Sequence, residues 1–264
     1  MVARLLITLL FYLLTTIAGA ENSCLDCHEP HYVKAGRCTF CHTGNPGTDR
    51  KNIAHDRLIG KRFAFYRDKN SAPVEYGQKL VKSSGCRRCH TFAGEGNRLA
   101  SNLDRVADLY QPAEISQAIK QPAFYMPDFR FSDDQVDALI NAILNAGTNA
   151  PLKTHEEPLR IHFESENSVK NNLFVDKCGA CHKIISFKGG GLGGGVVGPN
   201  LSGLLSKYYP YPFKESEGWS TENLEKWLKN PRKIKENARM LPIKLKVDEL
   251  PMLFKIIASE ESGK

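Results

Sequence analysis

The chain has 264 residues, which is enough for two or three small domains. Its formal net charge is +7, a basic balance that by itself can indicate binding to nucleic acid. After the first twenty residues no apolar stretch is long enough to cross a bilayer, which excludes a multispanning membrane protein.

The first predicted element is an export signal at residues 1–20. Arg4 is followed by the apolar run LLITLLFYLLTTIA and then by AGA, a small-x-small cleavage site that ends at Ala20. An uncleaved anchor is the alternative, although the apolar run is short for a bilayer span. We therefore expect an exported, periplasmic protein in an oxidising compartment, with no stable membrane span after cleavage and no nucleic acid as a partner.

All eight cysteines of the chain lie in four C-x-x-C-H motifs. Eight cysteines in an exported protein would ordinarily suggest four disulfides, but here a histidine directly follows each pair. Given the pairs, chance would produce this with a probability of roughly one in a million. Disulfide hairpins and redox C-x-x-C sites give no reason for the histidine. The motifs contain Cys24, Cys27 and His28; Cys38, Cys41 and His42; Cys86, Cys89 and His90; and Cys178, Cys181 and His182.

This spacing is typical of covalent attachment of haem c. Two thiols add to the two vinyl groups on one edge of the porphyrin, so two residues must separate them. The next residue then lies under the iron, where imidazole is a strong ligand. The motifs therefore predict four covalently bound haem c groups, each with the histidine of its motif as the proximal iron ligand.

The N-terminal segment, which we define as residues 21–68, contains two of the motifs and few apolar residues. The haems must therefore supply most of its core, and we predict a loop-rich dihaem module. Its end is crowded with cations, which form either a solvated face or partners for haem propionates. These are Arg50, Lys51, Arg57, Lys61, Arg62, Arg67 and Lys69.

Two further histidines in the N-terminal segment are candidate distal ligands. His31 lies three residues beyond His28, a reach of roughly 10 Å when fully extended, too short to pass around the porphyrin to its other face. If His31 binds iron, it must bind the neighbouring haem on Cys38 and Cys41. His55 would then bind the first haem. The alternative is that both are ordinary surface histidines.

Residues 69–150 are predicted to form helices around one haem. The stretch VEYGQKLVKSSGCRRCH reads as an amphipathic helix running into the attachment motif, and PAEISQAIKQP as a second helix that Pro122 stops. A third helix, SDDQVDALINAILNAG, has Ser132 as N-cap, Gln135 at the capping-box position and Gly147 as its stop.

Residues 151–166 are a charged linker that contains proline, and residues 167–264 repeat the plan of the preceding domain. The repeat extends to short motifs, such as IKQP against LKNP and ASNL against GPNL, which indicates an internal duplication. The stretch GGGLGGGVVGP lacks the lysine of a phosphate-binding loop, so we expect a flexible excursion beside the haem edge.

The motifs CGACH, GPNLSGL and WLKNP resemble those of a class I cytochrome c domain, and residues 77–149 resemble a second, shorter one. The N-terminal segment is similar to the compact bis-histidine modules of multihaem cytochromes. Together these resemblances imply an all-α fold with two tandem cytochrome c-like domains after the dihaem segment. They also imply that Pro199 offers its carbonyl to His182, whereas Ser101 occupies the equivalent position for His90.

The same resemblance implies a distal methionine between the last two helices of each domain. Met126, in YMPDF, fits this pattern well, and Met240, in RMLPI, fits with an inserted leucine before the proline. The alternative for either methionine is a core-filling role. With His31 and His55, these residues give four predicted irons four distal ligands.

We therefore expect an exported tetrahaem electron carrier. Bis-histidine haems of low potential would pass electrons to His/Met haems of higher potential, and partners would be redox proteins such as a membrane quinol-oxidising respiratory complex and a terminal acceptor. One alternative is a haem enzyme, a peroxidase or an oxyanion reductase, that uses a labile distal site. Another is a subunit of a haem filament.

Overall fold

The computed structural model describes residues 23–68, 70–150, 172–187, 190–213 and 218–258. The predicted export signal and the predicted linker at 151–166 lie outside the described residues. The described fold is mostly helical, with one two-stranded sheet, and this confirms the expected all-α class. Among the described residues, no helix is long and apolar enough to cross a membrane.

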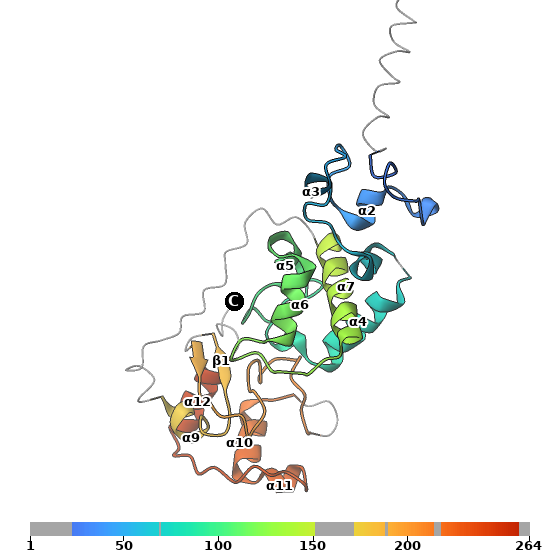
Figure 1. The fold of residues 1–264 in the computed structure, drawn as a ribbon. Coiled ribbons are helices and arrows are strands. Elements are labelled where there is room, and N and C mark those ends of the chain that lie inside the picture. The colour runs from blue at the N-terminus through green and yellow to red at the C-terminus, as the bar shows by residue number, and fades with distance from the viewer. Residues whose placement is uncertain (1–22, 69, 151–171, 188–189, 214–217, 259–264) are drawn as a thin grey trace, which may run out of the picture.

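The N-terminal segment consists of short helical turns joined by loops, at one end of the molecule (Figure 1). No residue from 23 to 58 is buried, so this stretch has no core made of amino-acid side chains. From Ile59 onward the segment packs against residues 69–150, which we call the middle domain, and Phe63 and Tyr66 join the hydrophobic cluster of that domain. The elements are η2 (Val33–Ala35), α2 (Cys38–His42), α3 (Lys51–Ala54) and η3 (Lys61–Arg67).

The predicted boundary at residue 68 therefore falls within a continuous structure. Ile59, Phe63 and Tyr66, which that boundary assigns to the N-terminal segment, lie in the same cluster as Val81 and Ile140. The amide of Asn145 also donates to the backbone carbonyl of Tyr66 (2.7 Å), fixing η3 on the last helix of the middle domain.

The middle domain is a group of helices around a hydrophobic core (Figure 1). Its first and last helices cross in close contact at Gly77, where an added Cβ would lie 2.0 Å from the carbonyl oxygen of Ala138. Only glycine permits this approach. The elements are α4 (Ala72–Ser83), η4 (Cys86–Arg88), α5 (Leu103–Leu109), α6 (Pro112–Lys120) and α7 (Asp133–Asn149).

The predicted capping box of α7 is confirmed. The backbone N–H of Gln135 donates to the Ser132 hydroxyl, and the Ser132 N–H donates to the Gln135 side chain (3.0 Å). The predicted stop at Gly147 is wrong, because α7 continues to Asn149. Gly147 instead allows close packing, since its added Cβ would lie 3.0 Å from the carbonyl oxygen of Asp104.

Residues 167–264, which we call the C-terminal domain, have a separate hydrophobic core. It includes Phe174, Ile184 and Leu253, all nearly inaccessible to solvent. Its first helix is much shorter than α4, and an antiparallel hairpin that pairs Ile184 with Leu192 follows the attachment motif. The elements are α9 (Leu173–Lys177), β1 (Ile184–Ser186), β2 (Gly190–Leu192), α10 (Thr221–Lys229), α11 (Pro231–Ile234) and α12 (Glu249–Ile257).

Candidate haem sites

The four C-x-x-C-H motifs share one local fold. In each, the backbone folds into a single helical turn; in three of them the histidine N–H donates to the first cysteine's carbonyl, and the fourth is helix α2. One turn brings both sulfur atoms and the imidazole to the same side of the backbone. None of the eight cysteines forms a disulfide. The three bonds join His28 to Cys24 (3.0 Å), His90 to Cys86 (3.0 Å) and His182 to Cys178 (2.8 Å).

Several attachment cysteines are withdrawn from solvent. Burial raises the pKa of the Cys86 and Cys178 thiols to about 11 each, and it also raises the pKa of Cys41 and Cys89. These thiols are therefore protonated at neutral pH. Because the thiolate is the nucleophilic form, burial makes these thiols less reactive.

In the N-terminal segment the structure brings the four histidines together as two pairs. His31 approaches His42 from the neighbouring motif, with 3.4 Å between their Nε2 atoms and an angle of 83° between the rings. His28 faces His55, with ring centroids 5.9 Å apart and planes inclined by 40°. The pairing therefore crosses between the two motifs, in the arrangement that the short reach of His31 predicts.

The spacing of the His31–His42 pair fits a metal ion between the two imidazoles. A metal–imidazole bond is about 2 Å long, so two nitrogens on opposite sides of one ion lie about 4 Å apart. The His31–His42 nitrogens need to separate by well under 1 Å to reach that distance. Helix α3 helps to position the other pair, because His55 caps its C-terminus and donates its backbone N–H to Lys51.

Three of the four histidines of the C-x-x-C-H motifs are oriented by a backbone carbonyl. Nδ1 of His42 bonds to the carbonyl oxygen of Ile59 (3.0 Å), Nδ1 of His90 to Ser101 (2.7 Å) and Nδ1 of His182 to Pro199 (2.8 Å). A carbonyl can only accept, so Nδ1 carries the proton and Nε2 keeps a lone pair for a metal. Burial also lowers the pKa of His90, which favours its neutral form.

The carbonyl partners of His90 and His182 are the residues that the family resemblance implies. Ser101 replaces proline without loss of the hydrogen bond, because only its backbone oxygen takes part. Gly198 allows the second loop to lie against the imidazole, since an added Cβ would lie 2.2 Å from Cε1 of His182.

The two candidate methionines lie on the expected loops. Met126 is half-buried between α6 and α7, and its N–H donates to the carbonyl of Ala123 (2.8 Å). Met240 is half-buried between α11 and α12, and its sulfur accepts a hydrogen bond from Nε1 of Trp227 (3.1 Å). In the described part of the chain, no hydrogen bond joins either methionine to the proximal histidine of its domain.

The role of the glycine-rich stretch could not be predicted from the sequence. We expected a flexible excursion, but Gly190–Leu192 forms strand β2, and the glycines that follow pack on the attachment motif. An added Cβ on Gly193 would lie 2.4 Å from the carbonyl oxygen of His182, and one on Gly195 would lie 2.3 Å from the carbonyl carbon of Cys181. Close approach of two backbones, rather than looseness, accounts for these glycines.

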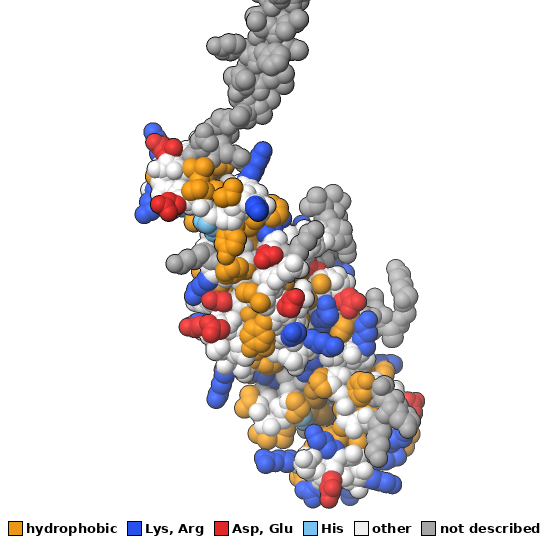
Figure 2. All heavy atoms as spheres, turned by 90° about the vertical axis from the view of Figure 1, so that its right-hand side faces the viewer, with side chains coloured by type: hydrophobic (Ala, Val, Ile, Leu, Met, Phe, Trp, Pro, Cys, Tyr) orange, Lys and Arg blue, Asp and Glu red, His pale blue; other side chains and the backbone are white. Residues whose placement is uncertain are grey.

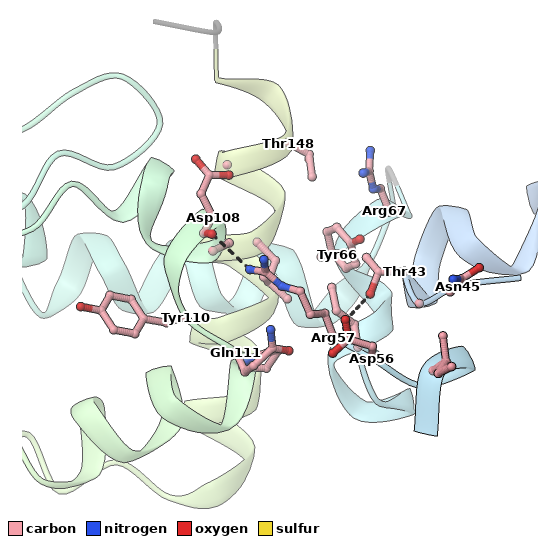
Figure 3. Close-up of a pocket in the computed structure, with 17 residues that line it drawn as sticks. Thr43, Asn45, Asp56, Arg57, Tyr66, Arg67, Asp108, Tyr110, Gln111 and Thr148 are labelled. Carbon is pink, nitrogen blue, oxygen red and sulfur yellow. Dashed lines mark hydrogen bonds between the residues drawn. The ribbon is translucent and has the colours of Figure 1, made fainter. Parts of the chain in front are cut away.

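A cavity of about 690 Å³ lies between the N-terminal segment and the middle domain (Figure 3). Arg57 extends across it and donates from Nη2 to the carbonyl oxygen of Asp108 (3.1 Å), while its own carbonyl accepts from the Thr43 hydroxyl (2.5 Å). No cysteine, histidine or methionine is among the described residues that line it. The cavity nevertheless borders the second C-x-x-C-H motif, because Thr43 directly follows His42 and the carbonyl oxygen of Ile59 bonds to Nδ1 of His42.

Residues 72–141 match the family model described as cytochrome c oxidase, cbb3-type, subunit III. The match covers a little over a quarter of the chain. It includes α4, the motif of Cys86, Cys89 and His90, Met126 and the first half of α7. The match supports a c-type cytochrome.

The same match supports covalently bound haem c and a role in electron transfer. The family match and the hydrogen-bond geometry agree in the middle domain. The matched residues contain the motif of Cys86, Cys89 and His90, and the carbonyl of Ser101 orients His90. No solved structure matches the chain.

Proposed function

We propose that this protein is an exported tetrahaem c-type cytochrome that relays electrons from a bis-histidine pair of haems to two His/Met haems. The observation that carries the proposal is the crossed pairing of His31 with His42 and His28 with His55. Haem supplies one-electron chemistry at its iron. The residues of the chain hold each site in a fixed geometry, which favours rapid transfer because few ligands must rearrange.

The direction of the relay follows from the ligands. Thioether is a weaker donor than imidazole and favours ferrous iron, so methionine ligation raises the reduction potential relative to a second histidine. Axial ligands move haem potentials over about 0.8 V. The sites of Met126 and Met240 are therefore the electron acceptors within the chain. The hydrogen bond from Trp227 to the Met240 sulfur also orients that side chain.

We propose redox proteins as partners, including a membrane quinol-oxidising respiratory complex on the donor side and a terminal acceptor. Support comes from the match of the middle domain to a subunit family of a respiratory oxidase. Lys and Arg side chains are concentrated on the C-terminal part of the face shown in Figure 2. This positive charge suits docking against an acidic surface of a partner protein. In this proposal the protein works in the periplasm.

The test combines a haem count with a redox titration. Intact mass under denaturing conditions should correspond to four haems, and a potentiometric titration should resolve a low-potential pair from two high-potential components. Met126→His should lower one high component and leave the low pair nearly unmoved. Fewer than four haems with two or more disulfides, or four haems in one narrow band of potential, would contradict the relay.

A further inference from the structure

The middle and C-terminal domains meet at Asn200, the residue after Pro199. The side-chain amide of Asn200 donates to the backbone carbonyl of Tyr125 (2.6 Å) in the middle domain. Its own carbonyl accepts from the Tyr209 hydroxyl (2.9 Å) and from Arg88 (3.4 Å), which lies between the attachment cysteines of the middle domain. A single residue therefore connects the His182 loop to both sides of the preceding haem site.

Tyr125 directly precedes Met126, the candidate distal ligand, and the C-terminal domain holds this part of the loop. The ring of Tyr125 lies so close to Gly191 that a Cβ there would be 2.3 Å from Cε2, and its hydroxyl donates to Gly193 (3.4 Å). Lys183 donates to the carbonyl of Phe124, and its Nζ lies 4.6 Å from the centre of that ring.

The side-chain oxygen of Asn200, which points away from the Met126 loop, is also fixed. This Oδ1 accepts from the backbone N–H of Ser202 (2.8 Å), and the buried Ser202 hydroxyl accepts from the N–H of Ile185 in β1. The amide is thereby locked with its donor toward the middle domain. Such preorganisation means that little conformational entropy is lost when the bond to Tyr125 forms.

We propose that Asn200 is a positioning residue for Met126, so that the C-terminal domain controls how firmly the methionine is held at the haem of the middle domain. This inference rests on the proposed function, in which Met126 is that haem's distal ligand. It adds that the ligand is held in place from outside its own domain. Loosening the contact should expose the iron more often without changing any ligand residue.

The test is Asn200→Asp in the full-length holoprotein, with imidazole as the probe. Aspartate keeps the oxygen that accepts from Ser202, but it removes the donor to Tyr125 and places a carboxylate beside that carbonyl. Imidazole competes for the iron only when the methionine leaves, so its apparent affinity scales with the open fraction. We expect that affinity to rise about fivefold at the haem of the middle domain, the change that loss of one neutral hydrogen bond produces.

Asn145→Asp is the matched control, because Asn145 makes an equally short amide-to-carbonyl bond to Tyr66 on another side of the same domain. Its imidazole affinity should equal that of the wild type. Met126→Ala and Met240→Ala assign each spectral change to one haem. Lys183→Ala, which removes the bond to Phe124, gives a second variant of the interface and should raise the affinity in the same direction.

Unchanged affinity in both Asn200→Asp and Lys183→Ala, or an equal rise in Asn145→Asp, would overturn the inference while leaving the proposed function intact. A wild-type spectrum without a methionine-ligated haem in the middle domain would overturn both. The wild-type spectrum is recorded first, so failure of the proposed function is recognised before any variant of Asn200 is made.

Discussion

Between residues 23 and 58 no side chain is buried, whereas in the middle domain Val136, Ile140 and Ala142 are completely inaccessible to solvent. Full burial of each large aliphatic side chain contributes about 1.5–3 kcal/mol, so the middle domain has a source of stability that the N-terminal segment lacks. The two regions carry the same attachment motif. In the proposed function, haem therefore supplies the core of the N-terminal segment, whereas the middle domain has a hydrophobic core of its own side chains.

The largest expected effect comes from removing the attachment cysteines of each region. Replacing all four cysteines of the N-terminal segment, Cys24, Cys27, Cys38 and Cys41, with alanine should unfold most of residues 23–58, because no apolar core remains to hold the chain. Hydrogen exchange followed by mass spectrometry should show loss of amide protection in α2 and α3. Cys86→Ala with Cys89→Ala is the matched change, and it should leave α4 and α7 protected. Persistent protection of α2 and α3 in the first variant would refute the contrast.

A smaller effect is expected from truncating one isoleucine in each region. Ile140→Ala removes a fully buried side chain and should lower the free energy of opening of α7 by about 3 kcal/mol, within the usual range for such cavities. Ile53→Ala removes a side chain that is 45% exposed and should change stability by no more than about 0.5 kcal/mol. Native-state hydrogen exchange measures both, and comparable losses would show that the N-terminal segment has an apolar core after all.

The same contrast explains what could be predicted from the sequence. The helices α4, α6, α7, α10 and α12 have apolar periodicity or capping residues, which are local signals. The crossed histidine pairing is predicted from the short reach of His31 together with the two neighbouring C-x-x-C-H motifs, and both of these signals are local.

Other features depend on packing between distant segments. The two strands of the β1–β2 hairpin have three residues each, and β2 begins with two glycines. The sequence therefore has no alternation of apolar and polar residues that would predict these strands. The hydrogen bonds of Asn145 to Tyr66 and of Asn200 to Tyr125 join residues 79 and 75 positions apart. A single sequence contains no periodicity that could reveal such contacts.

The smallest expected effect on stability comes from the exposed His31, whose loss leaves both thioether links of each haem intact. His31→Ala should convert the haem on Cys38 and Cys41 from low-spin to high-spin, because Nε2 of His31 lies beside Nε2 of His42. The haem on Cys24 and Cys27 should keep its His28 and His55 pair. Electron paramagnetic resonance measures the spin state of each haem, and variants that lack one attachment motif assign each signal to its haem.

His55→Ala is the mirror experiment for His31→Ala, and it should alter only the haem on Cys24 and Cys27. Because the two histidines belong to different pairs, the double variant should show both changes at once, each with the size it has alone. If His31→Ala instead changes the first haem, each histidine serves the haem nearest in sequence and the crossed arrangement is wrong. If neither variant produces a high-spin signal, both are surface histidines, and the N-terminal segment must hold its haems by other ligands.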